Sequence, residues 1–159
     1  MLTPTDILQA LDDVKDPEIP VVSVVELGII RAVQVDGERV TVDMAPTFAG
    51  CPALAVMQSL VAERVRQLGA TDVVVRLVLS PPWSSDWMTD SARAKLASFG
   101  LAPAPRHGGH IPLMFPDDAR CPHCGSTDTT LKNSFGPTLC RALYYCHGCL
   151  QPFEQFKAL

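Results

Sequence analysis

Two pairs of cysteines near the end of this 159-residue chain constrain its fold most strongly. Each pair has a Cys-x-x-Cys spacing, in Cys121-Pro122-His123-Cys124 and in Cys146-His147-Gly148-Cys149, and 21 residues separate the pairs. A Cys-x-x-Cys turn presents two thiolates from one tight loop, and two such turns complete a tetrahedral four-sulfur site. The spacing therefore predicts a zinc ribbon whose metal ligands are Cys121, Cys124, Cys146 and Cys149.

Four thiolates also suit iron, either as a rubredoxin-like centre or as a cluster, so the residues alone leave the metal open between zinc and iron. His123 and His147 lie inside the two turns and are alternative ligands or outer-shell groups, but a full thiolate set makes them unnecessary as ligands. A segment of about 40 residues has too little core to fold alone. We therefore expect the metal to supply folding free energy.

The part of the chain before the ribbon is predicted to be a small α+β domain, residues 1–100, in which helices pack on a sheet in the order αββαβα. Thr3, Pro4 and Asp6 are typical of a helix start. Asp36-Gly37 joins two β-rich segments and predicts a hairpin. Further along the chain, the apolar pattern predicts a helix over 53–68, a strand over 72–79 and a helix over 86–99 that ends at Gly100.

Two other segments complete the expected organisation. Residues 16–28 are too rich in proline to continue a helix and too apolar to be an exposed linker, so they are predicted to form a packed, ordered loop. Residues 101–118 contain four prolines and Gly108-Gly109, which is typical of a linker. The ribbon then occupies 119–159, and the fold class is an α+β domain followed by a zinc-ribbon-like β module.

Composition excludes several classes of function. The net charge is −4 and no cluster of basic residues is visible, so a nucleic-acid partner is not expected. No run of 18 apolar residues and no secretory leader pattern are found, so we expect no membrane partner and a cytoplasmic location with reduced thiols. Phosphate-loop, dinucleotide-fingerprint and nucleophile-elbow motifs are also missing, which argues against an autonomous enzyme.

Two further cysteines, Cys51 and Cys140, each allow two interpretations. Pro52 fits a first helical position, which would make Cys51 the N-cap of the helix over 53–68, where the helix dipole favours a thiolate. Cys51 is then either a metal-binding or reactive thiol or a buried cysteine in a tight turn. Cys140 is either a fifth thiol near the ribbon site or a small buried apolar residue.

Other polar and aromatic residues also allow two interpretations. Asp16, Glu18 and Glu26 are either ligands or acids that cap the proline-rich loop, and their chemistry favours caps. Trp83 and Trp87 either form an aromatic edge for a partner or pack in the core and loops, and packing is the commoner role.

Several motifs in residues 3–100 resemble the small domain of cytosolic iron–sulfur assembly factors and related bacterial cluster-maturation proteins. They are Asp16-Pro17-Glu18-Ile19-Pro20, Leu27-Gly28-Ile29, the segment Thr47 to Cys51-Pro52, and Pro82-Trp83 with Met88 downstream. The tail resembles the C-terminal module of the PaaD family of phenylacetyl-CoA epoxidase subunits. There the resemblance rests on residues 134–149, Pro152-Phe153-Glu154 and Phe156-Lys157.

The resemblance implies an accessory maturation factor of the phenylacetyl-CoA epoxidase, a ring-epoxidising monooxygenase of aerobic phenylacetate degradation. Its implied partners are the oxygenase or reductase subunits, and its implied role is to assist insertion of metal or an iron–sulfur cluster, not to catalyse the epoxidation. Cys51 and the four ribbon cysteines match the family motifs, and Cys140 matches a cysteine expected in the tail. Pro137 and Arg141 stand where a serine and a lysine are expected.

These observations give one leading hypothesis and two rivals. In the first, Cys51 binds iron or a cluster transiently while a zinc-stabilised ribbon docks the client. Because Cys51 supplies one thiolate, a cluster needs further ligands from Cys140, a second protomer or the client, so a homodimer is expected. In the second, the chain is a non-catalytic adaptor that holds the oxygenase and reductase together. In the third, iron bound in the ribbon performs electron transfer or catalysis.

Overall fold

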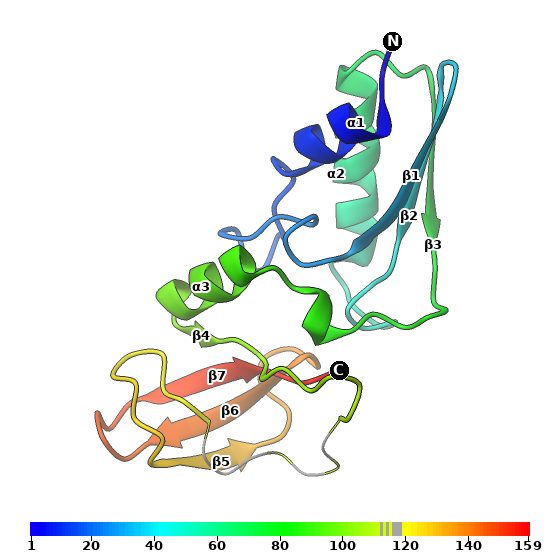
Figure 1. The fold of residues 1–159 in the computed structure, drawn as a ribbon. Helices are drawn as coiled ribbons and strands as arrows, with labels where there is room; N and C mark the ends of the chain where they lie inside the picture. The colour runs from blue at the N-terminus through cyan, green and yellow to red at the C-terminus, as the bar shows by residue number, and fades with distance from the viewer. Residues whose placement is uncertain (112, 114, 116–118) are drawn as a thin grey trace. The chain divides into compact units, whose positions relative to one another are not determined.

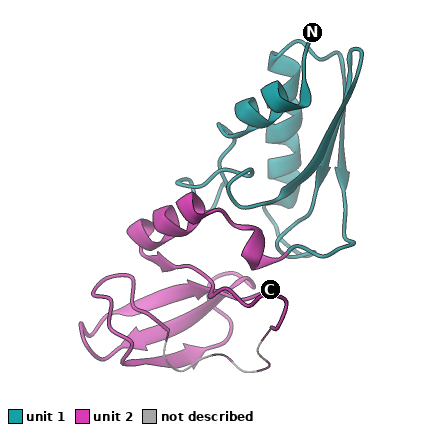
Figure 2. Cartoon of the chain, in the orientation of Figure 1, with its two compact units in different colours: residues 1–83 teal, residues 84–159 magenta. Residues whose placement is uncertain are grey.

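The computed structural model describes residues 1–111, 113, 115 and 119–159, which form two compact units, 1–83 and 84–159 (Figure 2). The first unit contains α1 (Pro4–Leu11), β1 (Ile30–Asp36), β2 (Arg39–Met44), α2 (Leu54–Gln67) and β3 (Asp72–Leu77). The second contains η1 (Ser85–Trp87), α3 (Asp90–Phe99), β4 (Leu101–Ala102), β5 (Thr129–Asn133), β6 (Arg141–Cys146) and β7 (Pro152–Phe156), all labelled except η1 in Figure 1. The predicted α+β class is confirmed.

The first helix, α1, starts as its sequence predicts. The Thr3 hydroxyl accepts a hydrogen bond from the Asp6 N–H, and the Asp6 carboxylate accepts one from the Thr3 N–H, so the capping box is complete. The helix ends at Leu11, before the proline-rich segment 16–28 begins. Its inner face buries Ile7 and Leu11 against the rest of the first unit.

The sheet of the first unit has the strand order β1-β2-β3, with β2 antiparallel to β1 and parallel to β3. The parallel pair requires a crossover, which α2 supplies. Helices α1 and α2 cover one face of this sheet (Figure 1), and β2 buries Val40, Val42 and Met44. The alternate residues of β2 include Asp43, whose carboxylate is 2.7 Å from Arg76 Nε on the adjacent strand.

The loop between α1 and β1 is packed and ordered, as its composition predicts. Asp16 Oδ1 accepts hydrogen bonds from the N–H groups of Glu18 (2.8 Å) and Ile19 (3.1 Å). Glu26 Oε2 accepts one from the Ser23 N–H (3.0 Å). Asp16 and Glu26 therefore cap the loop, and the interpretation of these two acids as caps is confirmed.

Trp83 belongs to the core of the first unit. Its side chain is only 4% exposed, and its indole Nε1–H donates to the Leu27 carbonyl at 2.9 Å. A buried indole with a satisfied N–H stabilises the packed loop. For Trp83, core packing is therefore the correct interpretation, and an aromatic edge for a partner is wrong.

The sheet of the second unit has the order β4-β7-β6-β5 and begins earlier in the chain than expected. Leu101 and Ala102 form β4, which pairs in parallel with β7. The start of the expected linker, 101–118, is therefore a strand, and α3 is grouped with the ribbon in one compact unit. The division after residue 83 differs from the domain boundary expected at residue 100. Residues 112, 114 and 116–118 of the expected linker lie outside the described residues.

Arg93 connects the turn before α3 to the segment that follows β4. Its Nη1 donates to the Ala104 carbonyl, and its Nη2 donates to the Ser85 carbonyl at 2.8 Å. Burial lowers the pKa of this guanidinium from its ordinary value. One partly buried side chain on α3 thus holds both the turn before the helix and the backbone just after β4.

We predict that Arg93→Met destabilises the second unit by about 2 kcal/mol, because it leaves two carbonyl groups without their charged donor. Hydrogen exchange of the β6 and β7 amides would measure this change as a loss of protection. Arg66→Met, at an exposed position on α2, is the matched control and should change protection little. Equal protection in the two variants would contradict the prediction.

Candidate metal centre

Four thiols converge in the second unit. One ligand atom from each of Cys121, Cys124, Cys146 and Cys149 lies within 4.8 Å of all the others. Two Sγ–Sγ distances are 3.7 Å (Cys121 to Cys149) and 3.5 Å (Cys124 to Cys146). These distances are far too long for a disulfide, whereas a tetrahedral site with metal–sulfur bonds of about 2.3 Å has sulfur atoms about 3.8 Å apart. The thiols therefore have the spacing of a four-sulfur metal site.

Each pair of thiols is presented by a turn that closes on itself. In the first turn, the Gly125 N–H donates to the Cys121 carbonyl at 2.8 Å, and the Cys121 N–H donates to the Ser126 carbonyl at 2.9 Å. The residue after the second cysteine is left-handed in both turns: Gly125 has φ +77° and Leu150 has φ +61°. Glycine adopts this conformation without strain, whereas leucine does so at a cost of about 1 to 2 kcal/mol.

Backbone groups and burial give the thiols unequal acidity. The Cys149 N–H is the main cause that lowers the pKa of Cys146, to about 7, and the Gly148 N–H adds to the effect. Burial is the main cause that raises the pKa of Cys149, to about 12. Metal binding requires thiolates, so loading this site releases protons.

The two histidines in the turns lie outside the converging set. His147 Nε2 is 2.7 Å from the Thr130 hydroxyl, and its ring meets Tyr145 edge to face with centroids 5.4 Å apart. His123 packs against Gly100, where an added Cβ would lie 3.3 Å from His123 Cε1. Neither imidazole belongs to the four-thiol group.

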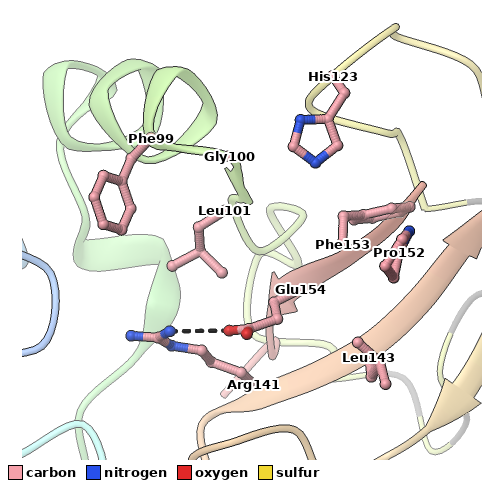
Figure 3. Close-up of a pocket in the computed structure, with 9 residues that line it drawn as sticks. All are labelled: Phe99, Gly100, Leu101, His123, Arg141, Leu143, Pro152, Phe153 and Glu154. Carbon is pink, nitrogen blue, oxygen red and sulfur yellow. Dashed lines mark hydrogen bonds and ion pairs between the residues drawn. The ribbon is translucent and has the colours of Figure 1, made fainter. Parts of the chain in front are cut away.

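A cavity of about 290 Å³ adjoins the first turn, with His123 on one side and α3 on the other (Figure 3). Phe99, Gly100 and Leu101 line it from the end of α3 and from β4. Arg141 and Glu154 also line the cavity, and Arg141 Nη1 is 2.9 Å from Glu154 Oε2. The Arg141 charge is thus already balanced within the cavity wall.

Cys51 does not occupy the position that its sequence predicts. The N-cap of α2 is Ala53, because residues 52 and 53 form a turn before regular helix begins at Leu54. The Leu54 N–H donates to the Cys51 carbonyl at 3.2 Å, which closes that turn. Cys51 is partly exposed in the first unit, and the prediction that it is the N-cap of the helix is wrong.

Cys140 lies in the second unit but outside the four-thiol group. It is partly exposed, and its Sγ is 3.2 Å from the Thr138 hydroxyl. Its carbonyl accepts a hydrogen bond from the Lys157 N–H at 2.9 Å. It belongs to the β5–β6 loop and not to either Cys-x-x-Cys turn.

The residues that bring the two turns together were not predicted from the sequence. An added Cβ at Gly148 would lie 3.0 Å from Ser126 Cβ and 3.6 Å from Cys124 Sγ, so the two turns touch at this glycine. The sequence did contain one signal for this contact: a glycine between the second pair of cysteines allows another backbone segment to approach closely. Ser126 and Leu150 carried no such signal, because their roles depend on the paired turns.

Comparisons with known proteins match both units. Residues 4–78 match the family model of the iron–sulfur cluster assembly protein, and residues 113–157 match that of the PaaD zinc beta ribbon domain. A protein of Escherichia coli named as a 1,2-phenylacetyl-CoA epoxidase subunit is 41% identical over 97% of this chain and 92% of its own length.

Two further relatives match about three fifths of the chain. An Fe-S protein maturation auxiliary factor of Porphyromonas gingivalis is 38% identical over 59% of this chain and 90% of its own length. The solved structure of a conserved hypothetical protein of Thermotoga maritima is similar with a TM-score of 0.53 and 33% identity, over 60% of this chain and 94% of that one. Across the described residues, no helix combines the length and the apolar character needed to cross a membrane.

We predict that Gly148→Ala lowers the affinity of the four-thiol site for a divalent metal by about tenfold, because the new methyl forces the two turns apart. Competition with a chromophoric chelator measures this affinity. Gly50→Ala is the matched control, since an added Cβ there meets nothing closer than 3.9 Å. An unchanged affinity in Gly148→Ala would show that the contact with Ser126 does not set the spacing of the thiols.

Proposed function

Because the chain belongs to the PaaD family of phenylacetyl-CoA epoxidase subunits, we propose that it is an accessory maturation factor of that multicomponent monooxygenase. Its role is to assist insertion of metal or an iron–sulfur cluster into an oxygenase or reductase subunit in the cytoplasm, and it does not perform the epoxidation. One observation carries the proposal: a match to an iron–sulfur assembly family and a match to a ribbon family occur in one chain.

The ribbon site holds zinc in this proposal, and its ligands are Cys121, Cys124, Cys146 and Cys149. Four thiolates complete a closed tetrahedral shell, which leaves no open position for substrate or water. Zinc in such a shell supplies structural cross-linking of the two turns. Support comes from the sulfur spacing and from the match to a family described as a zinc ribbon.

The cargo is held elsewhere, with Cys51 as its transient ligand. A closed four-sulfur site retains its metal, whereas a carrier must release it. Cys51 is partly exposed and provides one thiolate, so an iron–sulfur cluster needs further ligands from Cys140, a second protomer or the client. Support for Cys51 comes from the match of residues 4–78 to the assembly family.

Metal analysis of anaerobically purified protein tests this function. We expect about one zinc ion per chain in wild type and in Cys51→Ser, and we expect iron and acid-labile sulfide in wild type that Cys51→Ser loses. The measurement is elemental analysis together with sulfide determination. Zinc alone in both proteins, with full epoxidase activity after assembly with Cys51→Ser, would contradict the carrier function and favour a zinc-stabilised adaptor.

A second prediction separates the roles of the cysteines in the second unit. Cys121→Ser should lose the zinc and unfold β5 to β7, because structural zinc contributes about 10 to 16 kcal/mol in small domains, comparable to the whole stability of a domain. Hydrogen exchange should show this loss while β1 to β3 stay protected. Cys140→Ser is the control in the same unit and should keep both zinc and protection.

A further inference from the structure

We propose that the outer edge of β3 pairs with the same edge of a second copy of this chain, so that the two sheets join into one. The pairing is antiparallel about a two-fold axis at Val74, which places Asp72 of one copy opposite Arg76 of the other. The proposal goes beyond the proposed function, because it names a homodimer interface that requires neither metal nor cluster. β3 lies at the edge of its sheet (Figure 1), and the described residues place no strand beside that edge.

The backbone of β3 offers hydrogen-bonding groups along this edge. Just after the strand, the Val78 N–H donates to the Met44 carbonyl of β2 at 2.8 Å, so the even-numbered residues of this segment bond to β2. Backbone groups alternate between the two edges of a strand, so those of Val73, Val75 and Leu77 point outward. In the proposed pairing, Val73 of one copy faces Val75 of the other. Each such pair exchanges two hydrogen bonds between N–H and carbonyl groups.

β3 lacks the features that keep an edge strand from pairing. Its register with β2 runs without a shift from Asp72 to Leu77, and the strand contains neither lysine nor proline. The other edge strand, β1, has a register shift between Ile30 and Ala32. Bulges, lysines and prolines are common means by which natural sheets prevent edge pairing. Of the two edges of this sheet, the edge at β3 is therefore the better suited to pair.

Charged side chains on β2 and β3 complement each other across the proposed interface. Within one copy, Arg39 Nε lies 3.4 Å from Asp72 Oδ2 on the adjacent strand. Asp43 Oδ1 likewise lies 2.7 Å from Arg76 Nε. Opposite charges that face each other across two strands stabilise their pairing. Cations and anions then alternate from one copy into the other, in the order Arg39, Asp72, Arg76 and Asp43.

The same charges favour one register over its neighbours. A slide of two residues places Asp72 and Arg76 opposite apolar residues of the other copy, and a slide of four opposes Asp72 to Asp72 or Arg76 to Arg76. Like charges directly opposite each other destabilise a strand pair. The side chains of Asp72 and Arg76 are 54% and 53% exposed, so both are accessible to a second copy. Asp43 engages Nε and Nη2 of Arg76, which leaves Nη1 to donate to a further carboxylate.

A second copy is the occupant because this edge is complementary to itself. In a two-fold interface, each copy supplies the carboxylate and the guanidinium that the other copy requires. Val74, which is half-buried in one copy, faces Val74 of the other at the centre of the pairing. A strand from a different protein would need the same alternation of charge and valine to pair equally well.

Sedimentation velocity of the whole chain over a range of concentrations tests the proposal. We expect wild type to dimerise and Val75→Pro to raise the dissociation constant of the dimer by about tenfold or more, because proline removes an outward N–H without removing a bond to β2. Val33→Pro is the matched control, since alternation places its N–H on the outer edge of β1, and it should dimerise as wild type does. A monomeric wild type at every concentration, or equal dissociation constants for wild type and Val75→Pro, would overturn the proposal.

Disulfide trapping tests the register with variants that leave the backbone of β3 unchanged. The two copies of residue 74 form a pair without hydrogen bonds, with Cα atoms about 4.5 Å apart, which lies within disulfide range. We expect Val74→Cys to give a disulfide-linked dimer on mild oxidation, and Val75→Cys to give no more of it than wild type. No linked dimer from Val74→Cys, or more from Val75→Cys, would refute this pairing. Neither readout involves metal or the epoxidase, so that outcome would leave the proposed function standing.

Discussion

The four-thiol cluster is the constraint on which the second unit depends. Two members of a buried cluster in this unit, Cys121 and Cys146, are also ligands in the candidate metal centre. Tyr144 and Phe153 stack beside them with ring centroids 5.5 Å apart. The candidate metal site and this part of the core therefore share residues, so a metal bound there would also stabilise the packing around it.

The two units are stabilised by different physical means. The first has an apolar core under α1 and α2. The carboxylates of Asp16 and Glu26 accept hydrogen bonds from backbone N–H groups of its long loop. The second adds to its metal site a charged anchor, Arg93, which fixes the backbone on both sides of α3. If the four-thiol site holds zinc as proposed, removal of the metal should therefore affect the second unit while the first keeps its fold.

Local signals in the sequence predicted the elements that depend on local chemistry. The capping box at Thr3 and Asp6, the hairpin at Asp36-Gly37 and the two Cys-x-x-Cys turns all form as their residues suggest. Strand β4 could not be predicted in this way, because its two residues gain their pairing from β7, about fifty positions later in the chain. Pro52 suggested a helix start, but residues 52 and 53 form a turn and the helix begins at Leu54. The N-cap position assigned to Cys51 was therefore wrong.

The placement of the six cysteines limits how one chain can both stay folded and release metal. Two of the four converging thiols, Cys121 and Cys146, also belong to the core cluster that contains Tyr144 and Phe153, so loss of a metal bound there would weaken the packing of these two rings. A site whose metal also stabilises the core is poorly suited to release that metal repeatedly. Cys51 and Cys140 are different, because both are partly exposed and lie outside the converging group. In the proposed carrier function, transient metal binding therefore falls to these two thiols, and the ribbon contributes a stable body.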